Sequence, residues 1–395
     1  MKTYIVRLAF LYAFAAGFAF TSCSEWMEAE SLDFDAKNTD IETTRDDAYY
    51  AALREWKNTP ELPQTFVWFD GWNGSSPDGA ASMRGLPDSV TLISLWNAPK
   101  FILTDAQRAD MEYVRRVKGT KVVVCILAGR LGDRITEYDE NWWDDVPDIG
   151  NSSDAAYVRP YIAKYAESIH DAVVANGFDG FDWDYEPTVG GDAGAYLWRN
   201  KTQRTIFVEE LSYWFGKGAT EEGRDRGDRK PAHPGLLLVI DGEVGSSYAA
   251  NMDPEWPFYY FDYFVHQAYN STTVSALNTR VNGTVNALQH WVDAGKMTKE
   301  DIVKRCILTE NFESHASSGG GILTQSSYIY VGTGSHAGVD QQIGGFGVFR
   351  VGLSYLTGSA YGGSPEYSYL RQGITNIYRI YNERMNPPAE EEPEP

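Results

Sequence analysis

The chain is poor in cysteine and histidine for its 395 residues. It has three cysteines and six histidines, and their spacing matches no zinc pattern. Cys125 and Cys306 lie in apolar, strand-like runs, so we expect two buried free thiols rather than a disulfide. The sequence therefore implies no metal site.

Positive charge and a phosphate-binding loop are also missing. The chain has 34 Lys and Arg against 55 Asp and Glu, a formal net charge of −21. This balance argues against a nucleic-acid partner and disfavours peripheral binding to anionic membranes. The Gly-rich segment 317–321 has no Lys-Ser/Thr partner, so it is not a phosphate cradle. We expect no cofactor.

The apolar run near the start is too short to span a bilayer comfortably. Lys2 and Arg7 precede the apolar residues 8–20, and small residues stand just before Cys23. This pattern favours a lipoprotein signal over 1–22 with Cys23 as the lipidated residue. An ordinary secretory signal with a fortuitous cysteine is the alternative. The acids after Cys23 resemble those of surface-exported lipoproteins of the Bacteroides type. We therefore expect an outer-membrane lipoprotein exposed at the cell surface, and a monomer whose membrane contact is the lipid anchor.

Strand-like and helical patterns alternate from residue 65 onward. An acidic tether with one short helix is expected over 23–60, the main folded domain over 61–385, and a disordered acidic tail over 386–395. The expected strands are 65–70, 90–96, 121–127, 178–186, 236–241, 263–269, 305–311 and 345–350.

This alternation predicts an α/β fold with a parallel sheet, and eight strands fit a (β/α)8 TIM barrel in a single domain. The helical patterns after strands one, five and seven are weak, so we expect some degenerate helices there. A doubly wound sheet is the alternative, but no Gly-rich phosphate loop follows the first strand.

Polar or aromatic residues close six of the expected strands. In a TIM barrel, catalytic groups lie at the carboxyl ends of the strands, so these residues should meet at one mouth. They are Asp70, Trp96 with Asn97, Glu186, Asp241, Tyr269 with Asn270, and Glu310 with Asn311.

The segment DGFDWDYEP, residues 179–187, places four acids in an otherwise buried strand. Side chains alternate along a strand, so Asp182, Asp184 and Glu186 share one face and the aromatics take the other. Asp179 has the opposite parity, and we expect it to brace the start of the strand. An exposed edge strand is disfavoured by the flanking apolar run. A calcium loop is disfavoured because Pro187 stands where such a loop needs glycine.

The same segment resembles the D-G-x-D-x-D-x-E signature of glycoside hydrolase family 18 at every specified position. The resemblance implies a retaining, substrate-assisted reaction in which the 2-acetamido group of the sugar attacks and an oxazolinium forms. Glu186 would be the general acid, and Asp184 would hold the acetamide N–H. Asp182 would share a proton with Asp184. Tyr269, in HQAYN, resembles the tyrosine of the sixth strand, whose hydroxyl steadies the acetamido group.

Family 18 contains chitinases, endo-β-N-acetylglucosaminidases and non-catalytic lectin-like members. Chitinases usually carry Ser-x-Gly-Gly on strand three and a Trp on strand eight, where this chain has CILAGRLG and GGFGVFRVG. The segments HQAYN, TENFES and GGFGVF look more like endoglycosidases that cut the chitobiose core of N-glycans. A chitinase remains open. A glycan-binding protein without turnover is disfavoured, because lectin-like relatives typically lose the glutamate that this chain keeps.

The expected partner is therefore an N-linked glycan of a glycoprotein. Loops after strands three and four carry Trp142, Trp143 and Trp198 as possible sugar platforms, although a loop anchored by its own aromatic is the commoner arrangement. The candidate substrate-binding residues are Asp70, Trp72, Trp96, Asn97, Trp198, Gln267, Asn270, Glu310 and Asn311.

If Cys23 is lipidated, Cys23→Ala should move the protein out of the membrane fraction, because the acyl chains supply the attachment. Fractionation of cells that express each form measures this. Unchanged partitioning of the variant would contradict the lipoprotein assignment.

Overall fold

The computed structural model describes residues 45–75, 79–97, 100–188, 193–244, 257–324, 328–357 and 366–387. The predicted signal peptide, Cys23, the first part of the predicted tether and the end of the predicted tail lie outside these residues. Within the described ranges, no helix combines the length and apolar character needed to cross a membrane.

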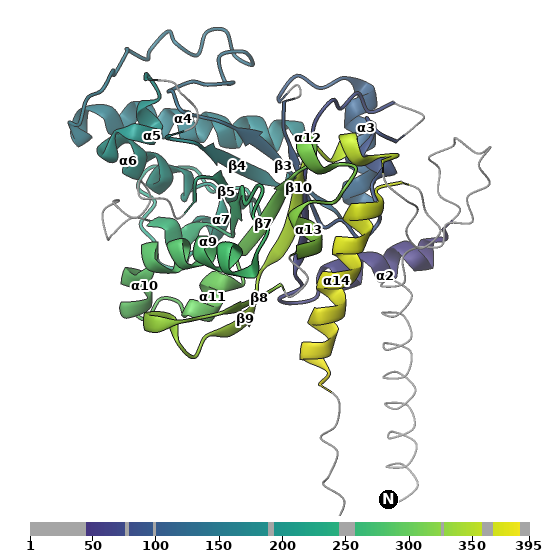
Figure 1. The fold of residues 1–395 in the computed structure, drawn as a ribbon. Helices are drawn as coiled ribbons and strands as arrows, with labels where there is room; N and C mark the ends of the chain where they lie inside the picture. The colour runs from purple at the N-terminus through teal and green to yellow at the C-terminus, as the bar shows by residue number, and fades with distance from the viewer. Residues whose placement is uncertain are drawn as a thin grey trace, which may run out of the picture.

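Eight parallel strands close into a barrel, which confirms the predicted (β/α)8 fold (Figure 1). Going round the barrel, the strand order is β1, β2, β3, β4, β5, β6, β7 and β10, and β10 pairs with β1 to close it. The strands are β1 Gln64–Phe69, β2 Leu92–Leu95, β3 Lys121–Ile126, β4 Gly180–Tyr185, β5 Leu237–Gly242, β6 Tyr263–His266, β7 Cys306–Asn311 and β10 Gly345–Phe349.

The helices after β2, β3, β4, β6 and β10 are well formed. The capping residues read from the sequence mark where two of these helices begin or end. The capping box of Thr104 and Gln107 opens the helix after β2, and Gly177 closes the helix after β3 in the left-handed conformation. The helices are α2 Asp47–Lys57, α3 Asp105–Arg116, α4 Ala155–Asn176, α5 Tyr196–Arg199, α6 Lys201–Leu211, α7 Gly216–Ala219, α9 Val274–Ala287, α10 Gln289–Asp293, α11 Lys299–Val303, α12 Phe312–His315, α13 Gly321–Thr324 and α14 Ser368–Met385.

The expected weakness after strands one, five and seven is confirmed in the described parts of these connections. Only 3-10 turns follow β1 and β5, at η1 Met83–Gly85 and η2 Pro257–Tyr260. After β7 come the one-turn helices α12 and α13 and an antiparallel hairpin of β8 Ile329–Val331 and β9 Asp340–Gln342, which flank η3 Gly334–His336. A further 3-10 turn, η4 Val351–Ser354, follows β10.

Strand β4 is buried on both faces, and the two faces differ in chemistry. Phe181, Trp183 and Tyr185 face outward, and the Trp183 ring lies 5.3 Å from the ring of Phe207 on α6. Each large apolar side chain contributes about 1.5–3 kcal/mol on burial. These three offset part of the cost of burying carboxylates on the inward face, which is several kcal/mol per ion.

The inside of the barrel is closed by apolar side chains below the acids. Phe66 and Trp68 of β1 pack edge to face at 4.6 Å and join an interior cluster. Gly347 of β10 leaves the space that the Phe66 side chain occupies, since a Cβ there would lie 2.9 Å from it. The remaining buried members are Leu92, Val123, Cys125, Val239, Val265 and Ile307. Water is thereby excluded from one end of the acid row.

The short helix predicted within the tether is α2, and it packs on the barrel. Helix α2, placed in the tether by the sequence, buries Tyr50 and Leu53, and Lys57 Nζ donates to Val90 O at 2.8 Å. Trp56 contacts Tyr378 of α14 edge to face at 4.8 Å, so α2 and α14 lie side by side (Figure 1). The apolar face of α2 is what packs, because an amphipathic helix is stabilised mainly by tertiary packing.

A buried carboxylate on α3 holds the loop between β1 and β2. Asp110 accepts hydrogen bonds from Trp72 Nε1 at 2.8 Å, Ser82 Oγ at 2.7 Å and the Met83 amide at 2.8 Å. Its side chain is fully buried, so these donors replace the water that an ionised carboxylate needs. The loop beside the mouth is therefore attached to the helix layer.

Asp110→Ala should lower the free energy of unfolding by ~3–5 kcal/mol, because several buried donors lose a charged acceptor. Denaturant unfolding followed by circular dichroism measures this. Glu112→Ala on the same helix is the matched control, since Glu112 is exposed and its ion pair with Arg116 is worth about 0.5 kcal/mol or less. Equal stability of the two variants would contradict this role.

Candidate active site

The inward face of β4 carries a row of carboxyl groups that ends at the barrel mouth. Asp182 and Asp184 are buried, whereas Glu186 follows the last residue of the strand and is half-buried. Successive inward positions on a parallel strand climb toward its carboxyl end. Glu186 is therefore the member of the row that a substrate in the mouth can reach, in agreement with the alternation expected from the sequence.

Asp179 lies at the start of the strand, away from this row. Its two oxygens accept from Arg115 Nε and Nη2, both at 2.7 Å, and Oδ2 also accepts from the Val122 amide at 2.9 Å. A bidentate arginine pair of this kind fixes geometry. Asp179 thus joins α3, β3 and β4 below the site, at the place where a brace was expected.

The lowest acid of the row has a hydroxyl partner. Ser94 Oγ of β2 donates to Asp182 Oδ2 at 2.5 Å. Burial raises the pKa of Asp182 to about 6, and the Ser94 hydrogen bond works against that rise by favouring the charged form. For Asp184, burial and then repulsion by Glu186 and Asp182 raise the pKa well above its usual range. The two acids therefore cannot both ionise without cost.

A fourth carboxyl group, on the neighbouring strand, joins the row. Asp241 of β5 is the register partner of Asp184 and is buried. Gln267 bridges two acids, because its Nε2 donates to Glu186 Oε1 at 2.9 Å and to Asp241 Oδ1 at 3.3 Å. The sequence pointed to Asp241 only as the acid that closes strand five. Nothing in the sequence joined it to Gln267.

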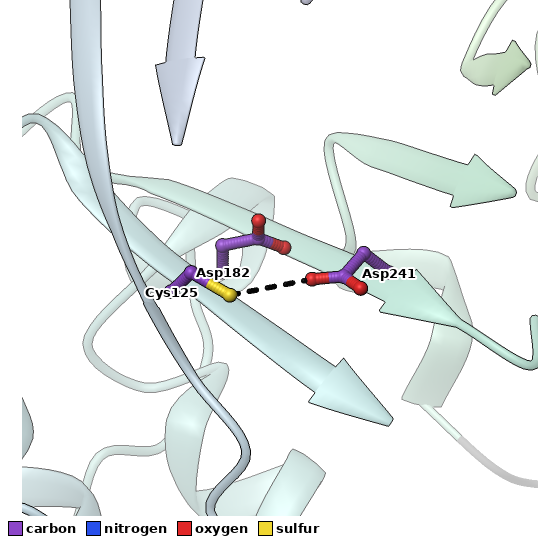
Figure 2. Close-up of side chains that lie close together, drawn as sticks. All are labelled: Cys125, Asp182 and Asp241. Atoms are coloured by element: carbon purple, nitrogen blue, oxygen red, sulfur yellow. Dashed lines mark hydrogen bonds between the residues drawn. The ribbon is translucent and has the colours of Figure 1, made fainter. Parts of the chain in front are cut away.

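Cys125, Asp182 and Asp241 lie together below the mouth (Figure 2), with one ligand atom of each within 4.8 Å of the others. The Cys125 Sγ atom donates to Asp241 Oδ2 at 3.6 Å. Burial, then the neighbouring Asp241, raises the pKa of the Cys125 thiol well above its ordinary value, so the sulfur keeps its proton. In this structure the three side chains form a hydrogen-bonded cluster of an acid pair and a thiol.

Phe349 ends β10, the strand on which the sequence offered no tryptophan. Its ring packs edge to face on Trp96 at 4.7 Å and stacks beside Tyr269 at 5.9 Å, with 27° between the ring planes. All three rings are half-buried. They form an apolar surface at the open end of the acid row, which suits the flat face of a sugar ring.

Tyr269 keeps its phenolic proton. Burial raises the pKa of Tyr269 well above its usual value, and Asp241, Asp184 and Glu186 add to the rise. Strand β6 ends at His266, so Tyr269 lies in a turn rather than in the predicted strand 263–269. Asn270 in that turn has a φ of 59°, which ends the regular pleat.

Three predicted substrate-binding residues are buried and hold neighbouring loops. Trp72 is held by Asp110, and Trp198 donates from Nε1 to Leu127 O at 2.8 Å. Glu310 is buried, and its oxygens accept from the amides of Asn270, Asn311 and Gly321.

The remaining predicted binding residues lie on the rim. Asp70 accepts from Arg350 Nε at 2.7 Å, Asn270 Oδ1 lies 2.9 Å from His315 Nε2, and Asn311 Oδ1 accepts from the Glu313 amide at 2.7 Å as the N-cap of α12. Asn97 is exposed in a left-handed turn with a φ of 44°. Of the loop tryptophans after β3, Trp142 is buried and Trp143 is 44% exposed.

Comparison with known proteins agrees with this geometry. The family described as "Glycoside hydrolase family 18, BT1044-like" matches residues 27–375. A solved structure named BT1044, a selenomethionine form with a glutamate-to-glutamine substitution, is 23% identical over 86% of this chain and 97% of that chain, with a TM-score of 0.60. A family 18 chitinase from Pseudoalteromonas aurantia is 15% identical over 80% and 99% of the two chains, with a TM-score of 0.43.

A chitinase from Bacteroides thetaiotaomicron is 12% identical over 81% of this chain and 98% of that chain, with a TM-score of 0.43. A search of curated protein sequences finds no match. The family match covers most of the chain and includes the whole acid row. The chain therefore belongs to glycoside hydrolase family 18, in the BT1044-like group.

Proposed function

We propose that this protein is a retaining endo-β-N-acetylglucosaminidase that cleaves the bond between the two N-acetylglucosamine units of the N-glycan core. The observation that carries the choice of substrate is the mouth built by Phe349, Trp96 and Tyr269. In the described residues, a short hairpin stands after β7 where many chitinases insert a small domain. The hairpin, together with Phe349 on the strand where chitinases usually carry a Trp, favours the endoglycosidase over the chitinase.

Glu186 acts first as the general acid. Gln267 occupies Oε1 of its carboxyl group with a donated hydrogen bond, which leaves Oε2 to carry the proton toward the mouth. The proton passes to the glycosidic oxygen as the bond from the anomeric carbon to that oxygen breaks.

The nucleophile is the acetamide carbonyl oxygen of the substrate, which attacks the anomeric carbon and gives a cyclic oxazolinium. Positive charge then develops on the acetamide. Asp184, directly below Glu186 on the same face, accepts its N–H and offsets the charge, while the Tyr269 hydroxyl donates to the acetamido oxygen. Water, deprotonated by Glu186, opens the ring from the same side and restores the acid, so the anomeric configuration is retained.

We also propose that the protein acts on glycoproteins from the outer membrane, held by a lipid on Cys23. The signal-like residues 1–22 and the acids that follow the cysteine support this placement. A surface position would give the enzyme access to large N-glycans.

Incubation of the protein with an N-glycoprotein should leave one N-acetylglucosamine on each asparagine and release the rest of the glycan, which mass spectrometry detects. Glu186→Gln is the matched control, since it keeps the shape of the side chain and removes the proton donor. Its turnover should fall by ~10²–10⁴ while folding and glycan binding persist. Efficient release of chitobiose from chitin oligomers, with intact glycoproteins, would instead support a chitinase.

A thiazoline analogue of the oxazolinium that carries the glycan portion should inhibit, because the site binds the intermediate and its neighbouring transition states. Asp184→Asn should weaken this inhibition and slow cleavage, yet a preformed oxazoline should still be used. Tyr269→Phe should lose ~2–4 kcal/mol at most, the scale of one donor to a developing charge. The inhibition constants of the thiazoline for the wild type, Asp184→Asn and Tyr269→Phe measure this. A covalent adduct between sugar and protein would refute the mechanism.

A further inference from the structure

Asp241 projects into the acid row from a different strand. The pairing of β4 with β5 places it directly beside Asp184, and the pairing of β3 with β4 places Cys125 beside Asp182. Side chains at paired positions of parallel strands point to the same face of the sheet. Asp241 therefore lies against the catalytic acids without reaching the open mouth itself, since it is only 1% exposed.

The charges that face Asp241 are almost all negative. Lys100, after β2, is a buried cation that acts on Asp182 and Asp184, and its Nζ donates to Leu95 O at 2.9 Å. The titratable groups that face Asp241 are Asp182, Asp184 and Glu186 from β4, Cys125 from β3 and Tyr269 from the turn after β6. Three buried carboxyls and one nearby ammonium cannot all be ionised cheaply.

Two buried oxygens identify where a proton is needed. Asp182 Oδ1 and Asp184 Oδ1 are inaccessible to solvent and have no donor in the described structure as long as every carboxyl is ionised. An unsatisfied charged acceptor of this kind costs several kcal/mol. Asp241 lies beside both acids, because it is the register partner of Asp184 and one of its oxygens lies within 4.8 Å of an Asp182 oxygen. One proton on Asp241 would convert a repulsive contact into a donated hydrogen bond.

We propose that Asp241 is a positioning residue that holds the proton of the buried cluster, so that Asp184 stays ionised to receive the acetamide N–H. A protonated carboxyl group can still accept at its carbonyl oxygen. The Gln267 amide donates to Oδ1 of Asp241 and to Glu186. Asp241 therefore also sets the position of Gln267, and through it the orientation of the Glu186 carboxyl group.

The electrostatics agree with this geometry. Burial, followed by repulsion from Asp182 and Asp184, raises the pKa of Asp241 well above its ordinary value. The folded protein then binds a proton that the unfolded chain, with an ordinary carboxyl pKa of about 3.9, has lost at higher pH. Stability from this proton is full below the unfolded pKa and is lost as pH rises toward the folded pKa.

Denaturant unfolding across a range of pH tests the assignment without any substrate. Above about pH 5, the unfolding equilibrium constant of the wild type should rise more steeply with pH than that of Asp241→Asn, by about tenfold per pH unit, because one bound proton is lost. Equal slopes above about pH 6 would mean that another group holds the proton, which would overturn the proposal.

Asp262→Asn is the matched control for this measurement. Asp262 is a half-buried acid outside the row whose carboxylate accepts from the Leu238 amide at 2.9 Å, and burial raises its pKa to about 6. Its replacement should alter the pH slope only below about pH 6 and should leave turnover unchanged. A change of slope above about pH 6 in Asp241→Asn but not in Asp262→Asn would therefore come from the acid cluster, and not from the loss of a carboxyl group in general.

Infrared spectroscopy with isotope-labelled aspartate needs no variant at position 241 and applies even if a variant folds poorly. The wild type at neutral pH should show the carbonyl band of a protonated aspartic acid, and Cys125→Ala should shift that band, because Sγ contacts Asp241 Oδ2. Absence of the band, or a band unaffected in Cys125→Ala, would overturn the proposal.

A measurement of turnover in Asp241 variants also tests the role, and it rests on the proposed function. Asp241→Asn keeps a neutral donor and an acceptor, so turnover should stay within about tenfold of the wild type, whereas Asp241→Ala should lose ~10²-fold or more. Equal loss in both variants would show that the negative charge is needed and would overturn the proton-holding role. Should no glycan be cleaved by the wild type, the proposed function fails while the unfolding slopes still decide on the proton.

Discussion

The burial of carboxyl groups on the inner face of β4 is the constraint on which the rest of this structure depends. Ionised carboxylates in a dry interior are unstable unless they are paired or share protons. Ser94 on β2, Cys125 on β3 and Asp241 on β5 all contact the row from neighbouring strands. Closure of the barrel is what brings these groups together, and the apolar floor keeps water from competing with them.

Acids in this protein fall into two kinds, and burial alone does not distinguish them. Asp110, Asp179 and Glu310 accept several hydrogen bonds from backbone amides, side-chain hydroxyls or arginine. Asp184 and Asp241 lie mainly against other acids, and burial followed by these acids raises the pKa of both carboxyl groups. The first kind ties neighbouring elements and loops together, and the second kind lies in the acid row.

The mouth is built as a small aromatic surface beside an acid. Phe349, Trp96 and Tyr269 come from three different connections, and each ring is held by its contact with another. Arg350, next to Phe349, adopts a φ of 55° and binds Asp70 and Glu313, so the end of β10 is fixed at the rim. Such fixed backbone near the acids limits the reorganisation that accompanies reaction.

The sequence by itself determined the barrel, the direction of the acid row and the helices that would be degenerate. These features depend on local periodicity: alternation along one strand placed Asp182, Asp184 and Glu186 on one face, and capping residues set the helix starts. The weak helical patterns after strands one, five and seven likewise reflected local composition.

Only the tertiary structure decided which of the predicted residues are buried as loop anchors. Residue type and position in the sequence pointed to Trp72, Trp198 and Glu310 as substrate-binding residues. In the structure they anchor loops, because their hydrogen-bond partners, such as Asp110 and Leu127, lie far away along the chain. Asp241 joined the site for the same reason, since strand register between β4 and β5 is a pairing between distant segments. Local sequence patterns specify which face of a strand a side chain takes and where a helix begins or ends. Contacts between distant segments specify which side chains become partners.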